Sequence, residues 1–268
     1  MSTELPPLRD VISRFGLNSR KKFGQHFLLD LNLTSKIVRA AGNLSACTVI
    51  EIGPGPGGLT RALLDSGAKQ VIAIERDPRC VEAIEDLASH YNGRLKVIDA
   101  NALELNLAGL CQGPKKIVAN LPYNEATPLL ISWLKSINQF ESLTLMFQKE
   151  VADRLTASPG NKTYGRLSVL AQWLCHTNHE FDIARTAFTP PPKVESTLVT
   201  LTPRAEPLTA DWQNFEKVTR AAFGQRRKML RASLKPLNVD LESFGIDPTA
   251  RAETLSVDQF CTIARSIK

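Results

Sequence analysis

The feature that most constrains this chain is a regular alternation of short β-branched runs and helical stretches that begins near residue 48. Four strands are predicted by the runs TVIEI (48–52), QVIAIE (70–75), RLKVIDA (94–100) and KKIVAN (115–120). Two more are predicted by SLTLMFQ (142–148) and ESTLVTL (195–201). Continuously apolar strands separated by helices are typical of a parallel sheet covered on both faces. The sequence therefore predicts an α/β, Rossmann-like fold.

The segments between the strands carry helix signals, and the pattern changes near the C-terminus. LTRALLDSG (59–67) predicts one helix, and a longer one is expected from Asp77, a suitable N-cap, through Pro78 to about Tyr91. After Pro203 the periodicity is helical without a convincing strand. We therefore expect a first domain over 1–203, including an N-terminal segment 1–47, and a small all-helical domain over 204–268.

Composition excludes some classes of protein and leaves others open. The chain is 43% hydrophobic and has no apolar run long enough to span a membrane, and its N-terminus, with Glu4 and Asp10, lacks the apolar core of a secretory signal. Its five cysteines form no CxxC pair, which indicates reduced thiols in a cytoplasmic protein, and we expect no metal. For Cys175–His179 a helix end with exposed histidines is favoured over a zinc site. The net charge of +6 fits a polyanionic partner without requiring one.

A glycine loop leads directly from the first predicted strand into a helix. In VIEIGPGPGGLT (49–60), Gly53, Gly55 and Gly58 have the spacing of a dinucleotide-binding fingerprint, and Glu75 follows about 20 residues later, where an acid would bind ribose hydroxyls. Glycine allows the backbone to turn tightly and to approach a ligand closely. A purely structural turn is the alternative, but strand, loop, helix, strand and acid occur here in the order that a nucleotide site requires.

Acidic residues around this loop favour one nucleotide cofactor over another. Glu51 lies two residues before the first glycine, and Asp99 ends the third predicted strand at the same edge of the sheet. A pyrophosphate would be repelled by these carboxylates, whereas S-adenosylmethionine carries an ammonium group and a sulfonium. We therefore expect S-adenosylmethionine rather than NAD.

The fourth predicted strand ends in VANLPYN (118–124), at the edge where ligands bind in open α/β sheets. The side-chain oxygen of Asn120 and the carbonyl of Leu121 are two acceptors for the protons of one exocyclic amine, and Pro122 constrains the turn. Tyr123 offers a flat face for a base, a stacking interaction worth about 1–3 kcal/mol. The alternative is a capped strand end with Tyr123 in the core, and the neighbouring glycine loop weakens it.

Taken together, these motifs resemble the ribosomal RNA adenine dimethylase family. The resemblance rests on seven motifs in family order: FGQHFLLD (23–30), EIGPGPGGLT (51–60), NLPY (120–123), FQKEVADRL (147–155), YGRLSV (164–169), FTPPPKVES (188–196) and FGQRRKMLRASL (223–234). It covers about residues 15–268 and is stronger toward the enzymes that act on the small ribosomal subunit. It implies a Rossmann-like class I methyltransferase sheet with a C-terminal helical domain. The implied reaction is N6,N6-dimethylation of two adjacent adenosines near the 3′ end of 16S rRNA, with a role in subunit biogenesis.

The resemblance also implies roles for individual residues. His26 and Leu28 would close over the cofactor, Gly53 would contact its amino-acid end, and Asp99 would meet its adenine. Asn120 would lie between cofactor and target, and Phe188 would stack on the flipped adenine rather than anchor its loop. The proposed RNA contacts are basic residues of the C-terminal domain, on one predicted helix continuing past Phe223: Arg226, Arg227, Lys228 and Arg231. Arg20, Lys21 and Lys22 add charge before the cofactor segment. We expect a monomer.

One position departs from the family pattern as NLPYN continues. The family usually has a small or branched apolar residue there, and this chain has Glu125. We expect this carboxylate to interact favourably with the N-terminal dipole of the next helix. Beside the target site, its charge would repel RNA phosphate.

Three other functions compete with this interpretation. An adenine methyltransferase acting on DNA or on large-subunit rRNA is disfavoured by the C-terminal motifs, and a dehydrogenase is disfavoured by Asn120–Tyr123. A factor that binds immature subunits with little catalysis would be indicated by a degraded glycine loop or NLPY motif, and both are intact here.

Overall fold

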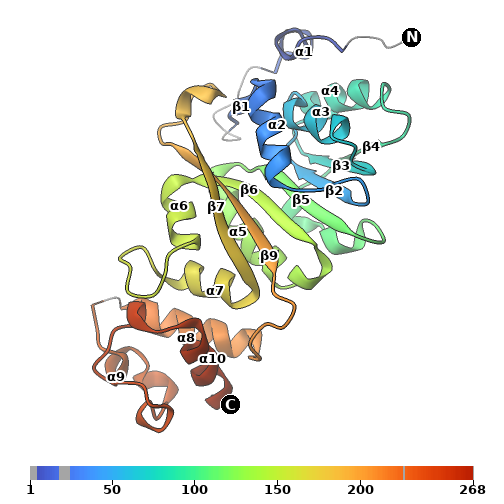
Figure 1. Ribbon diagram of the computed structural model, residues 1–268. Helices are drawn as coiled ribbons and strands as arrows, with labels where there is room; N and C mark the ends of the chain where they lie inside the picture. Colours follow the sequence, from blue (N-terminus) through green and yellow to red (C-terminus); the bar gives the residue numbers. More distant parts are fainter. Residues whose placement is uncertain (1–4, 18–24, 226, 268) are drawn as a thin grey trace. The chain divides into compact units, whose positions relative to one another are not determined.

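A computed structural model describes residues 5–17, 25–225 and 227–267 of the chain (Figure 1). It divides into two compact units. The first comprises residues 1–149 and 179–202, and the second comprises 150–178 and 203–268. Residues 150–178, which we had assigned to the first domain, therefore group with the C-terminal segment. Among the residues described, no helix is long and apolar enough to cross a membrane.

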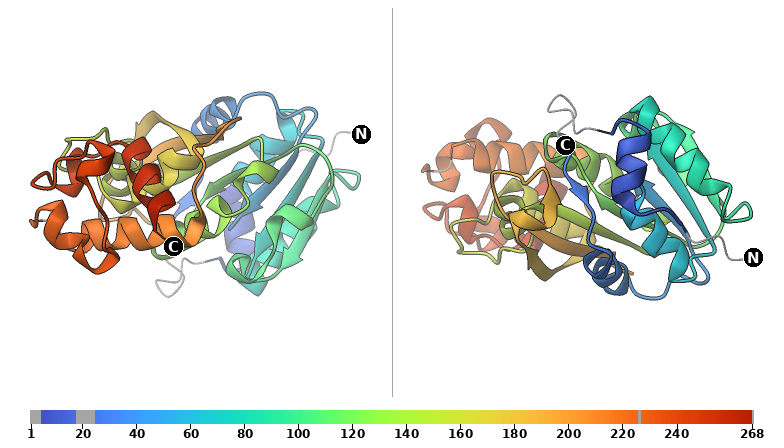
Figure 2. Two further views of the ribbon diagram at one scale, coloured as in Figure 1. Left: turned by 90° about the horizontal axis from the view of Figure 1, so that it is seen from below. Right: turned by 90° about the horizontal axis from the view of Figure 1, so that it is seen from above.

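The first unit is built on a mixed sheet with helices on both sides (Figures 1 and 2). The strand order is β4-β3-β2-β5-β6-β9-β7. The strands, in that order, are Leu95–Asp99, Gln70–Glu75, Thr48–Ile52, Lys115–Asn120, Ser142–Gln148, Ser196–Pro203 and Cys175–Ile183. Residue 203 of β9 and residues 175–178 of β7 are grouped with the second unit. From β4 to β6 all neighbours are parallel. The Rossmann-like prediction is confirmed, but the sheet is not wholly parallel, because β9 pairs antiparallel with β6.

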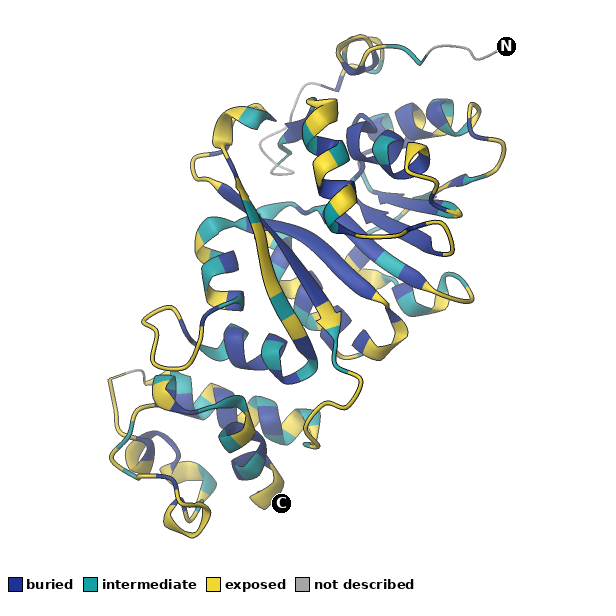
Figure 3. Ribbon diagram, viewed as in Figure 1, coloured by how far each residue is buried: buried dark blue, intermediate teal, exposed yellow. Residues whose placement is uncertain are grey.

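Helices cover this sheet through apolar stripes. The elements are α2 (Leu31–Ala40), α3 (Gly58–Asp65), α4 (Pro78–Ala88) and α5 (Tyr123–Leu134). Ile37, Leu63 and Ile84 from the first three pack against Val49 of β2 and Val71 of β3 in one buried cluster. Because successive strand residues face opposite sides, Ile50 and Ile72 are buried under the other layer. The central strands β2, β3, β5 and β6 are accordingly dark blue over most of their length in Figure 3.

Asp77 begins α4 as predicted. Its side chain accepts a hydrogen bond from the backbone N–H of Arg79, and Pro78 occupies the first turn. This capping satisfies one of the donors that a helix N-terminus leaves without an intrahelical partner.

The segment Cys175–His179, expected to be a helix end with exposed histidines, has the exposed histidines but lies in a strand. The helix α7 (Arg166–Leu174) stops one residue earlier, and β7 begins at Cys175. Cys175 is buried, whereas His176 and His179 are exposed, and β7 is yellow over much of its length (Figure 3). An edge strand with one side in solvent has few apolar residues, so its sequence lacks the pattern that identified the central strands. In the described part of the chain, no cluster of histidine, cysteine or acidic residues could hold a metal ion.

A short antiparallel ladder ties the N-terminal segment to the loop before β9. In it β1 (Phe27–Leu28) pairs with β8 (Phe188–Thr189), with Leu28 opposite Phe188. The N-terminal helix α1 (Leu8–Arg14) buries Leu8 and Val11. Val11 belongs to a small cluster with Leu17 and Phe27 that also includes Cys80 of α4.

The second unit has a core of its own. Its helices are α6 (Lys149–Leu155, whose first residue belongs to the first unit), α7, α8 (Trp212–Gly224), α9 (Leu230–Ser233) and α10 (Val257–Ser266). The ring of Trp173 stacks on Phe215 at a centroid distance of 4.0 Å and on Trp212 at 5.8 Å. Its indole N–H donates to the carbonyl of Leu208 at 2.6 Å.

The single helix that we predicted to continue past Phe223 is interrupted in the structure. α8 ends at Gly224, and α9 begins only at Leu230. The N–H groups of Leu230 and Arg231 donate to the carbonyls of Ala250 and Pro248 instead of continuing a helix. Arg227 and Lys228 therefore lie in the connection between the two helices, where both are exposed.

Replacing Trp173 with alanine should lower the free energy of unfolding by about 3–5 kcal/mol, because the change leaves a cavity among stacked rings. Urea unfolding of the full chain, followed by circular dichroism, would measure it. Leu208→Ala is the matched control: its side chain is 40% exposed and its carbonyl is retained, so less than about 1 kcal/mol is expected. Similar losses in both variants would contradict the assigned packing.

Candidate active site

One pocket gathers most of the residues singled out from the sequence. It lies at the carboxyl ends of β2, β3 and β5, where the chain order of the strands reverses on either side of β2. The predicted residues that line it are His26, Leu28, Glu51, Gly53, Gly55, Glu75, Asn120, Leu121, Pro122 and Tyr123. Gly58 of the predicted fingerprint also lines it, as do Gln25, Phe27 and Arg76, to which no role was assigned beforehand.

Glu51 supplies a buried carboxylate at the end of β2. The residue is 1% exposed, and its Oε2 atom has no hydrogen-bond partner in the described part of the chain. Burial raises the pKa of this carboxyl group to about 8, and repulsion by Glu75 contributes in the same direction. A buried acceptor without a donor is unfavourable, so the site is suited to a ligand that brings a donor or a positive charge.

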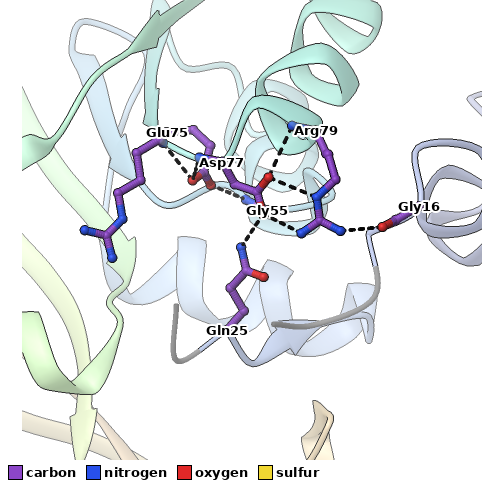
Figure 4. A network of polar contacts seen from close by, with 7 residues as sticks. Gly16, Gln25, Gly55, Glu75, Asp77 and Arg79 are labelled. Carbon is purple, nitrogen blue, oxygen red and sulfur yellow. Dashed lines mark hydrogen bonds and ion pairs between the residues drawn. The ribbon is translucent and has the colours of Figure 1, made fainter. Parts of the chain in front are cut away.

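Glu75 ends β3 and is held by backbone donors (Figure 4). Its Oε1 atom accepts from the N–H groups of Arg76 at 2.8 Å and Asp77 at 2.9 Å, and Oε2 accepts from Gly55 at 3.4 Å. Burial raises the pKa of Glu75, whereas these hydrogen bonds oppose the increase. The bond from Gly55 joins the glycine loop to the predicted ribose-binding acid.

Asp77 connects the pocket with the N-terminal segment (Figure 4). Its carboxylate accepts from the Arg79 guanidinium at 2.6 Å and from the Gln25 amide at 3.2 Å, and the hydrogen bond from Arg79 is the main reason that its pKa is lowered. Arg79 also donates to the carbonyl of Gly16 at 2.5 Å. The sequence identified Asp77 only as a helix cap, because no local pattern indicates a contact with Gln25, which lies 52 positions earlier.

The glycine loop approaches the N-terminal segment closely. Gly55 has a φ of +55°, in the region that favours glycine, and a Cβ at this position would lie 2.9 Å from the ring of Phe27. At Gly58 a Cβ would lie 2.5 Å from the carbonyl oxygen of Leu28. These glycines therefore allow β1 to cover the loop.

Asn120 is oriented by the same N-terminal segment. Its Nδ2 donates to the backbone carbonyl of His26 at 2.8 Å. This bond uses a donor of the amide and leaves Oδ1 as an acceptor, and in the described chain neither Oδ1 nor the Leu121 carbonyl receives a hydrogen bond. Two acceptors are thus available at the NLPY turn, as the sequence predicted.

Tyr123 lies at the start of α5 and is fixed on two sides. Its hydroxyl shares a hydrogen bond of 2.6 Å with Ser196 Oγ, and its ring stacks on the imidazole of His26 at a centroid distance of 5.7 Å and an interplanar angle of 27°. Burial raises the pKa of the phenol. The Nδ1 atom of His26 lies 2.7 Å from the Pro190 carbonyl oxygen. The ring of Tyr123 is therefore fixed at this side of the pocket.

Glu125 forms an ion pair with Arg76. Glu125 lies in the first turn of α5, and its Oε1 atom is 2.6 Å from Nη2 of Arg76. We predicted a favourable interaction with the helix dipole, and the position in the first turn fits it. The arginine partner, however, could not be foreseen from the sequence.

Some predicted residues are not brought to the pocket. Asp99 lies beside Glu75 in the β3–β4 register but is exposed and does not line the pocket. Phe188 is 2% exposed and packs in the core with Leu28, so its stacking on adenine remains a prediction that requires this ring to leave its present environment. Arg231 is exposed on α9 of the second unit, whereas Arg20–Lys22 and Arg226 lie outside the described residues.

The sheet order, the glycine loop and the acid at the end of β3 define a Rossmann-like class I methyltransferase. The profile of the ribosomal RNA adenine dimethylase family matches residues 16–268. The chain belongs to this family and is a ribosomal RNA adenine dimethyltransferase.

Individual relatives agree with this assignment. The chain is 57% identical to ribosomal RNA small subunit methyltransferase A of Rhodospirillum rubrum, over 98% of this chain and 93% of that protein. For the protein of the same name from Rhizobium johnstonii, identity is 59% over 98% of each chain. Among solved structures, a dimethyladenosine transferase from Plasmodium falciparum matches with a TM-score of 0.78 and 28% identity, over 89% of this chain and 96% of that one. The 23S rRNA methyltransferase ErmE matches with a TM-score of 0.71 and 26% identity, over 90% and 99%.

Gly58→Ala should destabilise the chain by about 1–3 kcal/mol, because the new methyl group would overlap the Leu28 carbonyl. Chemical unfolding would measure the change. The control is Gly224→Ala, since no atom lies within 4 Å of a Cβ at Gly224, and this variant should be unchanged or slightly more stable. Equal effects in the two variants would show that β1 does not press on the loop.

The raised pKa of Glu51 should make stability depend on pH. Between the ordinary value of 4.5 and about 8, the folded chain retains a proton that the unfolded chain loses. The stabilisation is complete below pH 4.5 and is lost as the pH rises through about 8, by at most about 1.4 kcal/mol per pH unit. Unfolding free energies measured from pH 5 to 8.5 should therefore decline less steeply in Glu51→Gln. Parallel curves for the two proteins would refute this assignment.

Proposed function

We propose that the chain transfers methyl groups from S-adenosylmethionine to N6 of two adjacent adenosines near the 3′ end of 16S rRNA. The observation that carries the proposal is the NLPY turn, where Asn120 presents its Oδ1 atom because its amide N–H is held by His26. The names of the two bacterial relatives support a small-subunit substrate. Such a substrate places the enzyme in the cytoplasm, where ribosomal subunits are assembled.

The pocket fits this cofactor by its own chemistry. Glu51 has a buried oxygen without a donor, which an ammonium group would supply, and Glu75 offers carboxylate oxygens to ribose hydroxyls. Gly53 and Gly55 bring the backbone close to the same space. When bound, the cofactor supplies an electrophilic methyl group on a positively charged sulfur. The carboxylate of Glu75 would disfavour a dinucleotide, whose pyrophosphate is anionic.

The residues of the turn would act by position and electrostatics. An adenine amine is weakly nucleophilic because its lone pair is delocalised into the ring. Asn120 Oδ1 and the Leu121 carbonyl would each accept a hydrogen bond from one N–H of this amine. These bonds would direct the lone pair toward the methyl group and stabilise the positive charge that develops on the nitrogen. Tyr123 would hold the base by stacking. The stacking energy between the base and the aromatic ring would offset the few kcal/mol needed to turn the base out of its stack in the RNA.

The second unit would supply affinity for RNA. Arg227, Lys228 and Arg231 are exposed, and cationic side chains that contact phosphates give binding that weakens as the salt concentration rises. Their role is to hold the RNA, and the specificity for adenine lies at the NLPY turn.

The proposal is tested by methyl transfer from labelled S-adenosylmethionine to small subunits that lack the dimethyl marks, with nuclease fragments identified by mass spectrometry. Asn120→Ala should reduce the rate by roughly 100-fold or more, because both orientation and charge stabilisation are lost. Asn43→Ala is the control and should retain the wild-type rate. The Asn43 side chain accepts a hydrogen bond from the nearby backbone N–H of Ser45, and the Asn43 carbonyl, which accepts from Lys116, is kept in the variant.

The site of modification decides among the outcomes. Two adjacent dimethyladenosines that disappear in Asn120→Ala would support the proposal. Methylation elsewhere in the RNA would contradict the target, and tight binding of subunits without any transfer would favour a role in assembly alone.

A further inference from the structure

The ion pair between Arg76 and Glu125 lies beside the cofactor pocket and joins two segments that are not neighbours in the sheet. Arg76 follows β3, and Glu125 lies in the helix that follows β5. Between these strands lies β2, which leads into the glycine loop. The pair therefore bridges the ends of the strands on either side of β2, where the pocket is formed.

Arg76 has an unusual position for a cation. Of the pocket-lining residues that the structure describes, it is the only lysine or arginine, and it accompanies the carboxylates of Glu51 and Glu75. The side chain of Arg76 is 35% exposed and that of Glu125 is 18% exposed, so water screens their charges incompletely. With Glu125 at 2.6 Å, most of the field of the guanidinium is cancelled by its partner.

We propose that Glu125 is a specificity-determining residue that neutralises Arg76 and thereby keeps the pocket selective for a cationic cofactor over its neutral product. This inference rests on the proposed use of S-adenosylmethionine. It also gives Glu125 a task different from the repulsion of RNA that its charge alone suggested.

The selectivity follows from the charge balance of methyl transfer. The sulfur–methyl bond breaks with its electron pair left on sulfur, a bond forms between the methyl carbon and N6, and one N6 proton is lost to solvent. S-adenosylhomocysteine therefore lacks the sulfonium charge but keeps the ammonium, carboxylate, ribose and adenine groups. A net negative pocket favours the reactant over this product, and an uncompensated Arg76 would reduce that preference.

Such a preference matters in a reaction with repeated transfers. Dimethylation of two adenosines requires a fresh cofactor after each methyl group. A pocket that releases the neutral product in favour of the cation limits product inhibition at each exchange.

The experiment measures binding of S-adenosylmethionine and of S-adenosylhomocysteine separately, by isothermal titration calorimetry without RNA. In Glu125→Gln the ratio of the two dissociation constants should shift against S-adenosylmethionine by roughly fivefold, the effect of one partly screened charge nearby. The double variant Arg76→Gln with Glu125→Gln should return close to the wild-type ratio, because neither charge remains.

A matched control is available on α4. Asp86 pairs with Arg14 at 3.3 Å and does not line the pocket. Asp86→Asn removes the same charge from the same kind of ion pair, so its ratio should equal that of the wild type. Thermal unfolding of all variants would show that they remain folded at the titration temperature.

Three results would overturn the inference. Equal weakening of the binding of both ligands in Glu125→Gln would indicate a purely structural ion pair. A double variant whose ratio of dissociation constants does not return to the wild-type value would exclude charge neutralisation as the cause. An unchanged ratio of the two dissociation constants in Glu125→Gln would show that the pair does not determine the preference for the cofactor. A wild-type chain that binds neither ligand would instead refute the proposed function itself.

Discussion

Parallel pairing of β2 with both β3 and β5 is the constraint on which the whole site depends. Each parallel strand ends at the same edge of the sheet, so Ile52, Glu75 and Asn120 deliver the glycine loop, an acid and an amide to one place. The side chains of Glu51 and Glu75 are buried there because the layers of helices exclude water. Burial without full hydrogen bonding is unfavourable for the apoprotein, and the same feature favours a cationic ligand.

The N-terminal segment converts this open edge into a pocket. It is held by β1–β8 pairing, by Gln25 on Asp77, and by the Asn120 amide on the His26 carbonyl. Gly58 permits the closest approach. The hydrogen bond at Asn120 links this segment to the NLPY turn, because the bond to the His26 carbonyl uses the amide nitrogen and leaves Oδ1 as an acceptor.

The charged side chains of this pocket are also arranged by the fold. Two acids face the cofactor space, and the one arginine among the described lining residues is paired with Glu125. In the second unit Arg227, Lys228 and Arg231 are exposed, and under the proposed function they contact the RNA backbone. The proposal thus assigns an acidic pocket to a small cation and exposed cationic side chains to a polyanion.

The central strands, the glycine loop, the N-cap at Asp77 and the NLPY turn could be predicted from the sequence, because each is encoded by residues close together in the chain. It did not reveal β7, the break before Leu230 or the grouping of residues 150–178 with the C-terminal unit, since an exposed edge strand and a backbone bond to Ala250 leave no local pattern. The burial of Phe188, the position of Asp99 outside the pocket and the ion pair between Arg76 and Glu125 are visible only in the tertiary structure. These outcomes depend on contacts between segments distant in the chain, and they are settled by packing and charge once the sheet has formed.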